Sequence, residues 1–128
     1  MNLVDSSGWI ELFTEGPNAE HFAGPIDDVE GLIVPTICLT EVFRFILRED
    51  TEGSALQAVA AMQQGKVVDL DPSLSLLAAT VGLQHSLPLA DSIIYATAQS
   101  VGATVWTEDA DFEGLPDVEF IKKRGRAQ

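Results

Sequence analysis

The chain has 128 residues, of which 46% are hydrophobic, so it can bury one sizeable core and is short for two. Its formal net charge of −13 is unlike that of a self-contained nucleic-acid binder, which usually carries a basic face. The sequence has neither the roughly 18 apolar residues of a membrane span nor an export signal at its N-terminus, so we expect one domain over residues 1–128, in the cytoplasm and without a membrane anchor.

Short runs rich in valine and isoleucine alternate with longer segments of helical period, which is the pattern of βα units around a parallel sheet. Glycine and proline pairs, such as Gly16-Pro17 and Gly24-Pro25, mark the breaks between segments. We expect strands at residues 2–5, 32–35, 66–70, 104–107 and 118–121. Helices are expected at residues 7–14, 36–51, 54–64, 73–85 and 89–101, with a short sixth helix at 17–22.

Asp5 ends the first predicted strand. In open α/β sheets the carboxyl ends of the strands form the edge at which ligands bind. Aspartate is also a preferred N-cap, and a helix is expected to begin near Ser7. Asp5 is therefore either a site residue or a helix cap.

The helix predicted after Pro35 has Thr36 as a reasonable N-cap and is apolar around most of its circumference over residues 37–47. We therefore expect it to be largely buried. It contains Cys38, the only cysteine of the chain, which cannot form an internal disulfide. An inert, buried thiol in a reducing compartment is the expected state, and this favours the cytoplasm.

Glu41 stands among the apolar residues of this helix, where an unpaired charge would be costly to bury. An ion pair with Arg44 or Arg48, on the same helix face, would compensate the charge. Coordination of a metal ion would also compensate it. Both explanations stay open at the level of the sequence.

Three more aspartates fall at informative places. Asp91 lies just after Pro88 at the start of a predicted helix, where it could also serve as a cap. Asp109 and Asp111 follow the fourth predicted strand, at the same edge of the sheet as Asp5. An acidic turn is common, so the position of these two residues carries more information than their type.

Acidic groups from two strand ends and two helices can thus reach one crevice. Carboxylates that close would repel one another strongly unless a cation lay among them. Ligands that are all oxygen favour Mg²⁺ or Mn²⁺, and the absence of paired cysteine or histidine argues against zinc. We expect a hard-cation site.

These segments resemble the PIN-domain nucleases and, among them, the VapC toxins of type II toxin–antitoxin pairs. Four motifs carry the resemblance and together span the chain: Leu3-Val4-Asp5-Ser6-Ser7, Thr40-Glu41-Val42, Pro88-Leu89-Ala90-Asp91-Ser92 and Thr107-Glu108-Asp109-Ala110-Asp111-Phe112. The segment around Asp91 is the most specific of them.

The resemblance implies a three-layer α/β/α sandwich around a mainly parallel five-stranded sheet, and Mg²⁺- or Mn²⁺-dependent cleavage of RNA. It implies a homodimer and, in agreement with the negative charge, a small basic antitoxin as partner. The matching positions for the acidic quartet are Asp5, Glu41, Asp91 and Asp109, with Asp111 as a further metal-ligand candidate because the fourth motif varies within the family. Ser6 and Thr107 either support this site by hydrogen bonding or have a purely structural role.

An RNA substrate must approach a strongly acidic protein. Arg44 and Arg48 share the face of Glu41, so we take them as candidates for contact with the RNA backbone, or else as charge partners of nearby acids. Most of the remaining positive charge is at the end of the chain, on Lys122, Lys123, Arg124 and Arg126.

Two other functions fit part of the pattern. A phosphoacceptor receiver domain would also be a small Mg²⁺-binding α/β protein, with Thr107 and a C-terminal lysine as its Thr and Lys pair. It would, however, leave Glu41 and Asp91 without a role. A non-catalytic PIN-like binding module is the second alternative.

We expect Trp9 and Trp106 in the core or a dimer contact, and His21 and His85 on the surface or in loops.

Overall fold

The computed structural model describes residues 1–125 and contains a five-stranded sheet in the order β3-β2-β1-β4-β5. All four strand pairs are parallel, so the expected sheet is confirmed. The strands are β1 (Asn2–Val4), β2 (Leu32–Pro35), β3 (Lys66–Val68), β4 (Thr104–Thr107) and β5 (Val118–Phe120).

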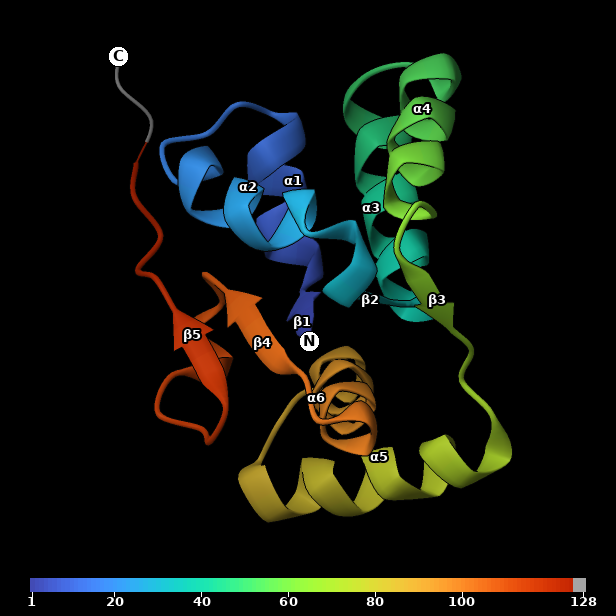
Figure 1. The fold of residues 1–128 in the computed structure, drawn as a ribbon, viewed down its shortest axis with the longest axis vertical. Coiled ribbons are helices and arrows are strands. Elements are labelled where there is room, and N and C mark those ends of the chain that lie inside the picture. Colours follow the sequence, from blue (N-terminus) through green and yellow to red (C-terminus); the bar gives the residue numbers. More distant parts are fainter. Residues whose placement is uncertain (126–128) are drawn as a thin grey trace.

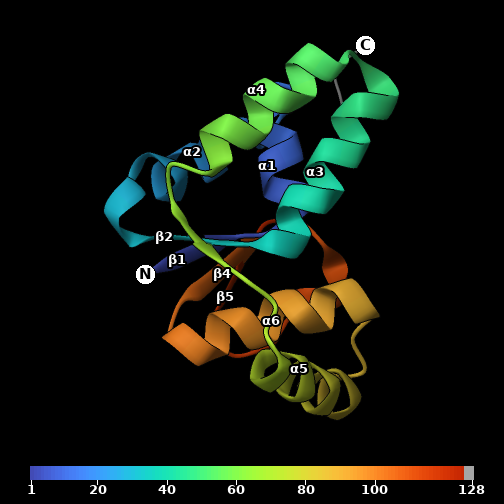
Figure 2. The ribbon, with the colours of Figure 1, turned by 90° about the vertical axis from the view of Figure 1, so that its right-hand side faces the viewer.

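Helices cover both faces of the sheet, which gives the expected α/β/α sandwich (Figures 1 and 2). Figure 2 shows α1 to α4 on one side and α5 and α6 on the other. The helices are α1 (Ser6–Phe13), α2 (Ala19–Asp27), α3 (Thr36–Glu49), α4 (Glu52–Met62), α5 (Pro72–His85) and α6 (Leu89–Val101), with 3₁₀ turns η1 (Val29–Gly31) and η2 (Ala110–Phe112). No helix in the described residues is long and apolar enough to cross a membrane.

Helix α2 is the element that differs most from expectation. The predicted break at Gly24-Pro25 is wrong, because α2 runs from Ala19 through Pro25 to Asp27. A proline inside a helix removes one hydrogen bond, but here its ring is buried together with Phe22. Burial of these two side chains offsets the missing hydrogen bond.

Helix α3 was expected to be largely buried, but it is amphipathic. Its buried residues are spaced four apart, at Cys38, Val42 and Ile46, while Arg44 and Arg48 are exposed. The cap expectation is also wrong, because Pro35 occupies the N-cap position and Thr36 is already helical. The helix ends at Glu49, and Thr51 caps α4 by accepting from the Ser54 amide over 3.0 Å.

The core lies on both faces of the sheet. Its largest fully buried side chains include Trp9, Phe22, Tyr95 and Phe112, with Leu3, Val4, Ile33, Val34 and Val105 contributed by the strands. Cys38 is fully buried, and burial raises the pKa of its thiol, as expected for an inert cysteine.

The two histidines are half-buried in helices and pack against aromatic rings, so neither lies in a loop. The His21 ring lies 5.1 Å from the Trp106 ring, and the His85 ring meets the Tyr95 ring edge-on at 5.4 Å. Trp106 is half-buried and donates from Nε1 to Asn2 Oδ1 over 2.8 Å. These rings have packing roles.

Candidate metal centre

The order of the strands decides where the site lies. From β1 the chain proceeds outward through β2 to β3, and it then returns to the other side of β1 for β4 and β5. Ligands of open α/β sheets bind at such a reversal, beyond the carboxyl ends of the two central strands. Asp5 directly follows β1, and Asp109 lies two residues beyond β4.

Asp5 is 2% exposed, and both of its carboxylate oxygens accept hydrogen bonds. Oδ1 accepts from the Gly8 amide over 3.1 Å and from the Ser7 hydroxyl over 2.6 Å, and Oδ2 accepts from the Thr107 hydroxyl over 2.7 Å. Asp5 is therefore the N-cap of α1 and also a buried carboxylate at the strand edge. Burial is the main reason that its pKa is raised to about 6, although the hydrogen bonds oppose this rise.

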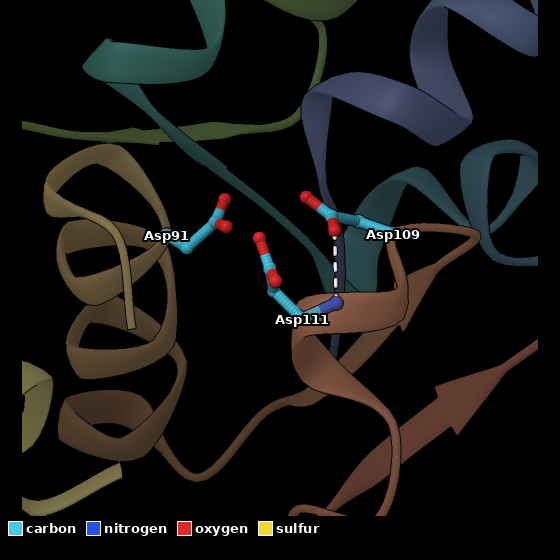
Figure 3. A group of neighbouring side chains, drawn as sticks. All are labelled: Asp91, Asp109 and Asp111. Carbon is cyan, nitrogen blue, oxygen red and sulfur yellow. Dashed lines mark hydrogen bonds between the residues drawn. The ribbon is translucent and has the colours of Figure 1, made fainter. Parts of the chain in front are cut away.

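Asp91, Asp109 and Asp111 form a group that we call the acidic cluster. One oxygen from each side chain lies within 4.8 Å of the others. Figure 3 shows Asp91 reaching from α6 toward the two aspartates of the loop that follows β4. The Asp111 amide donates to Asp109 Oδ1 over 2.9 Å, so one oxygen of the Asp109 carboxylate is used within the loop.

The acidic cluster is electrostatically strained. The pKa of Asp91 is raised to about 8, chiefly by burial and then by the negative charges of Asp109, Asp5 and Asp111. The capping interpretation of Asp91 is wrong, because Pro88 holds the N-cap position and no side-chain cap bond is made. Within residues 1–125 the ion pair found is Arg48–Glu49, so no basic side chain neutralises the cluster.

Two hydroxyl groups connect Asp5 with the loop that carries Asp109. The fully buried Thr107 side chain donates to Asp5 and accepts from the Asp109 amide over 2.9 Å. Ser7 donates to Asp5 and accepts from the Glu108 amide over 3.2 Å. Thr107 was expected from the sequence as a supporting residue, but Ser7 was missed. The position of Ser7 two residues after Asp5 could have indicated a hydrogen bond to that carboxylate.

Glu41 lies outside the acidic cluster, and the two arginines on its helix do not pair with it. Its Oε1 accepts from the Ser6 hydroxyl over 2.7 Å. Arg48 instead pairs with Glu49 over 3.0 Å and lies 5.4 Å above the Phe45 ring, while Arg44 is exposed. The ion-pair explanation of Glu41 is therefore wrong. Burial raises the pKa of the Cys38 thiol most, and the negative charges of Asp5 and Glu41 raise it further.

The structure thus sorts the sequence-predicted acids into two sets. Asp91, Asp109 and the further candidate Asp111 come together, whereas Asp5 and Glu41 lie beside them with hydroxyl partners of their own. A donor set made only of carboxylate oxygens, without a basic partner in the described part of the chain, fits Mg²⁺ or Mn²⁺. Glu11 and Glu108, two further buried acids next to this region, were missed by sequence reasoning.

The sequence matches the PIN domain family over residues 3–118, which is most of the chain. This chain belongs to the PIN-domain family. The match runs from β1 to the first residue of β5 and includes the three members of the acidic cluster. No curated protein matches the sequence at a significant level.

Solved structures with the same fold align with nearly all of this PIN-domain chain. One is a toxin–antitoxin complex from Klebsiella pneumoniae, with a TM-score of 0.79, 22% identity, and 93% of this chain and 96% of that chain covered. Another is VapC20 of Mycobacterium tuberculosis, titled a sarcin–ricin loop cleaving toxin, with a TM-score of 0.79 and 18% identity, and with 96% of this chain and 100% of that chain covered. A DNA-bound VapBC from Salmonella typhimurium has a TM-score of 0.71 and 17% identity, and 95% of this chain and 98% of that chain are covered. At these identities the likeness shows the fold.

The strand order also separates the PIN fold from a receiver domain. Receiver domains of the flavodoxin-like type have the order 2-1-3-4-5. This chain has the order 3-2-1-4-5, in which β1 and β4 are neighbours. The receiver alternative is therefore wrong.

Proposed function

We propose that this PIN-domain protein is a Mg²⁺- or Mn²⁺-dependent endoribonuclease and the toxin of a type II toxin–antitoxin pair. The observation that carries the proposal is the acidic cluster, three carboxylates within 4.8 Å at the strand reversal, with no basic partner among residues 1–125. Membership of the PIN-domain family and the likeness to VapC structures support it. The alternative is a PIN-like module that binds without cleaving.

In this proposal Asp91, Asp109 and Asp111 hold the cation, with Asp5 beside them. A divalent cation at this place would lower the pKa of a bound water and counter the charge of the RNA phosphate. Glu41 stands apart from the cluster and is fixed by Ser6, which suits acceptance of a proton from the attacking water better than direct ligation. Ser7 and Thr107 hold the Asp5 carboxylate in place.

We assign the antitoxin to a groove between α1, α3 and α4. A cavity of about 400 Å³ lies there, with a mixed lining that includes the apolar Phe13, Phe45 and Ile46 and the acidic Glu49 and Asp50. A groove that combines apolar and acidic side chains suits an amphipathic basic segment. A pull-down from the native host that recovered no small basic protein would count against this partner.

A second copy of the chain is assigned to the outer face of α5 together with the start of α6. Residues 72–90 contain no Asp, Glu, Lys or Arg, and Leu76, Leu83 and Leu89 are 73%, 87% and 79% exposed. Two copies that each carry a charge of −13 repel one another least where they meet through uncharged surfaces. The face is therefore suited to an isologous dimer.

Cleavage of a mixed, structured RNA pool with Mn²⁺, with Mg²⁺ and with EDTA tests the activity. We expect cutting with either cation, none with EDTA, and none by an Asp5→Asn, Asp91→Asn variant. A Glu20→Gln, Glu119→Gln variant removes the same number of charges at exposed positions and should cut like the wild type. Absence of cutting under every condition, together with absence of Mn²⁺ binding, would favour the non-catalytic module.

A further inference from the structure

Asn18 occupies the N-cap position of α2, but its side chain does not cap that helix. It is 1% exposed, and its polar atoms are used by other parts of the chain. Nδ2 donates to Glu108 Oε2 over 3.0 Å and to the Lys122 carbonyl over 3.1 Å, while Oδ1 accepts from Arg124 Nε over 2.8 Å. One buried amide thus joins the loop after α1, the loop after β4 and the C-terminal segment.

Asn18 also lies between two buried acids. Glu11 and Glu108 are each 6% exposed. The Asn18 backbone amide donates to Glu11 Oε1 over 3.2 Å, while its side chain donates to Glu108. A residue larger than glycine at Gly16 would overlap the Glu11 carboxylate, so the space for this pair is built into the turn.

Glu108 is the residue between Thr107 and Asp109. Its amide donates to Ser7 Oγ, and the next amide donates to Thr107 Oγ1, so the backbone of this loop is held from the side of Asp5. Its carboxylate is held from the side of α1 and α2, through Asn18. The loop is therefore anchored at two places, of which Asn18 provides one.

We propose that Asn18 is a positioning residue that fixes the loop after β4 and thereby places Asp109 in the acidic cluster. The effect on metal binding rests on the proposed function, whereas the effect on the loop does not. Asn18→Ala would keep the backbone amide that donates to Glu11 but would remove the side-chain donor to Glu108. Glu108 would then lose its anchor on the side of α1 and α2, and Asp109, the next residue, would move with it.

Amide hydrogen exchange of the metal-free protein tests the loop directly. In Asn18→Ala we expect the amides of Glu108, Asp109 and Asp111 to exchange at least about tenfold faster, with β1 unchanged. Mn²⁺ affinity, measured by calorimetry, should fall by a similar factor. A Thr51→Ala variant removes a cap far from the loop and serves as the control for general destabilisation.

Replacement of Glu108 separates positioning from stability. The side-chain amide introduced by Glu108→Gln can still accept from Asn18 and can donate to Glu11. Glu108→Gln alone should therefore leave loop exchange unchanged, and in the Asn18→Ala background it should restore part of the protection. Should Asn18→Ala fail to fold, Arg124→Ala removes one donor to Asn18 from the exposed side and should speed loop exchange less.

Loop exchange in Asn18→Ala equal to that of Thr51→Ala would overturn the proposal. A wild-type protein that binds no Mn²⁺ would instead contradict the proposed function, and the exchange measurement would still decide the role of Asn18.

Discussion

The Ser6 hydroxyl donates a hydrogen bond to Glu41 Oε1 over 2.7 Å and so joins the first residue of α1 to the second turn of α3. Ser6 directly follows Asp5, so the same short segment also positions the buried carboxylate at the end of β1. The contact fixes where Glu41 lies relative to Asp5. It also replaces the ion pair that the helix sequence suggested.

Removal of this hydroxyl should impair catalysis while the fold stays intact. Ser6→Ala frees Glu41 to adopt other rotamers, and we expect kcat for RNA cleavage to fall on the order of tenfold, at a stability cost of about 1 kcal/mol. Single-turnover cleavage measures the first effect and thermal unfolding the second. Ser100→Ala, which removes a hydroxyl that bonds the Thr97 carbonyl, is the control. Equal rates for the two variants would contradict the role given to Glu41.

The stability of the metal-free protein should decrease between pH 5 and pH 8. In the folded state the pKa of Asp5 is raised to about 6 and that of Asp91 to about 8, mainly by burial. An acid whose folded pKa is raised binds its proton more tightly when folded, so its favourable contribution is lost as the pH rises through the folded pKa. We expect Tm in EDTA to fall over this range.

Mn²⁺ should raise Tm more at pH 8 than at pH 5, because the cation competes with protons for the carboxylates. The variant Asp91→Asn should flatten the pH dependence in EDTA, since it removes one of the titrating groups. A Tm in EDTA that rises from pH 5 to pH 8 would show that the cluster is not strained as described.

Arg44 and Arg48 remain predicted RNA contacts. Arg48 is paired with Glu49, yet its side chain is 61% exposed and accessible to a phosphate. Replacement of both by Ala should weaken RNA binding. The slope of log Kobs against the logarithm of the salt concentration should become shallower by about 1.4, the value for two lost phosphate contacts on single-stranded RNA. Fluorescence titration at several salt concentrations measures this slope. A Lys122→Ala, Lys123→Ala variant removes equal charge elsewhere, and a weakening confined to it would place the RNA at the C-terminal segment.

The outer face of α5 should carry the dimer contact. Leu83 is 87% exposed, and Leu83→Glu puts a charge into the uncharged surface, so we expect the variant to sediment as a monomer where the wild type sediments as a dimer. Leu56→Glu on α4, where the leucine is 54% exposed, should leave the dimer unchanged. A wild type that is monomeric at micromolar concentrations would exclude this contact.

The sequence predicted the features that depend on topology. The ends of β1 and β4 placed Asp5 and Asp109 at one edge, because parallel strands bring their carboxyl ends together. It did not predict which carboxylates approach most closely. Asp111 joins the acidic cluster through the 3₁₀ turn η2, and helical or strand periodicity carries no information about such a turn.

The burial of Glu11 and Glu108 could not be predicted from the sequence for a different reason. Acidic side chains are rarely fully buried, so a pattern of residue types assigns them to the surface. Both accept a hydrogen bond from Asn18, which lies outside their own helix and loop. The extent of α2 was missed similarly, because burial of Pro25 outweighs the local signal of Gly24-Pro25.

Calorimetric titration of the metal-free protein with Mn²⁺ tests most directly whether the acidic cluster is a cation site. We expect saturable binding by the wild type and by Glu119→Gln. For Asp91→Asn and for Asp109→Asn we expect the affinity to fall at least about tenfold, since each removes a charged ligand from the set. Absence of binding by the wild type, or binding that survives both aspartate replacements unchanged, would contradict a cation site at the acidic cluster.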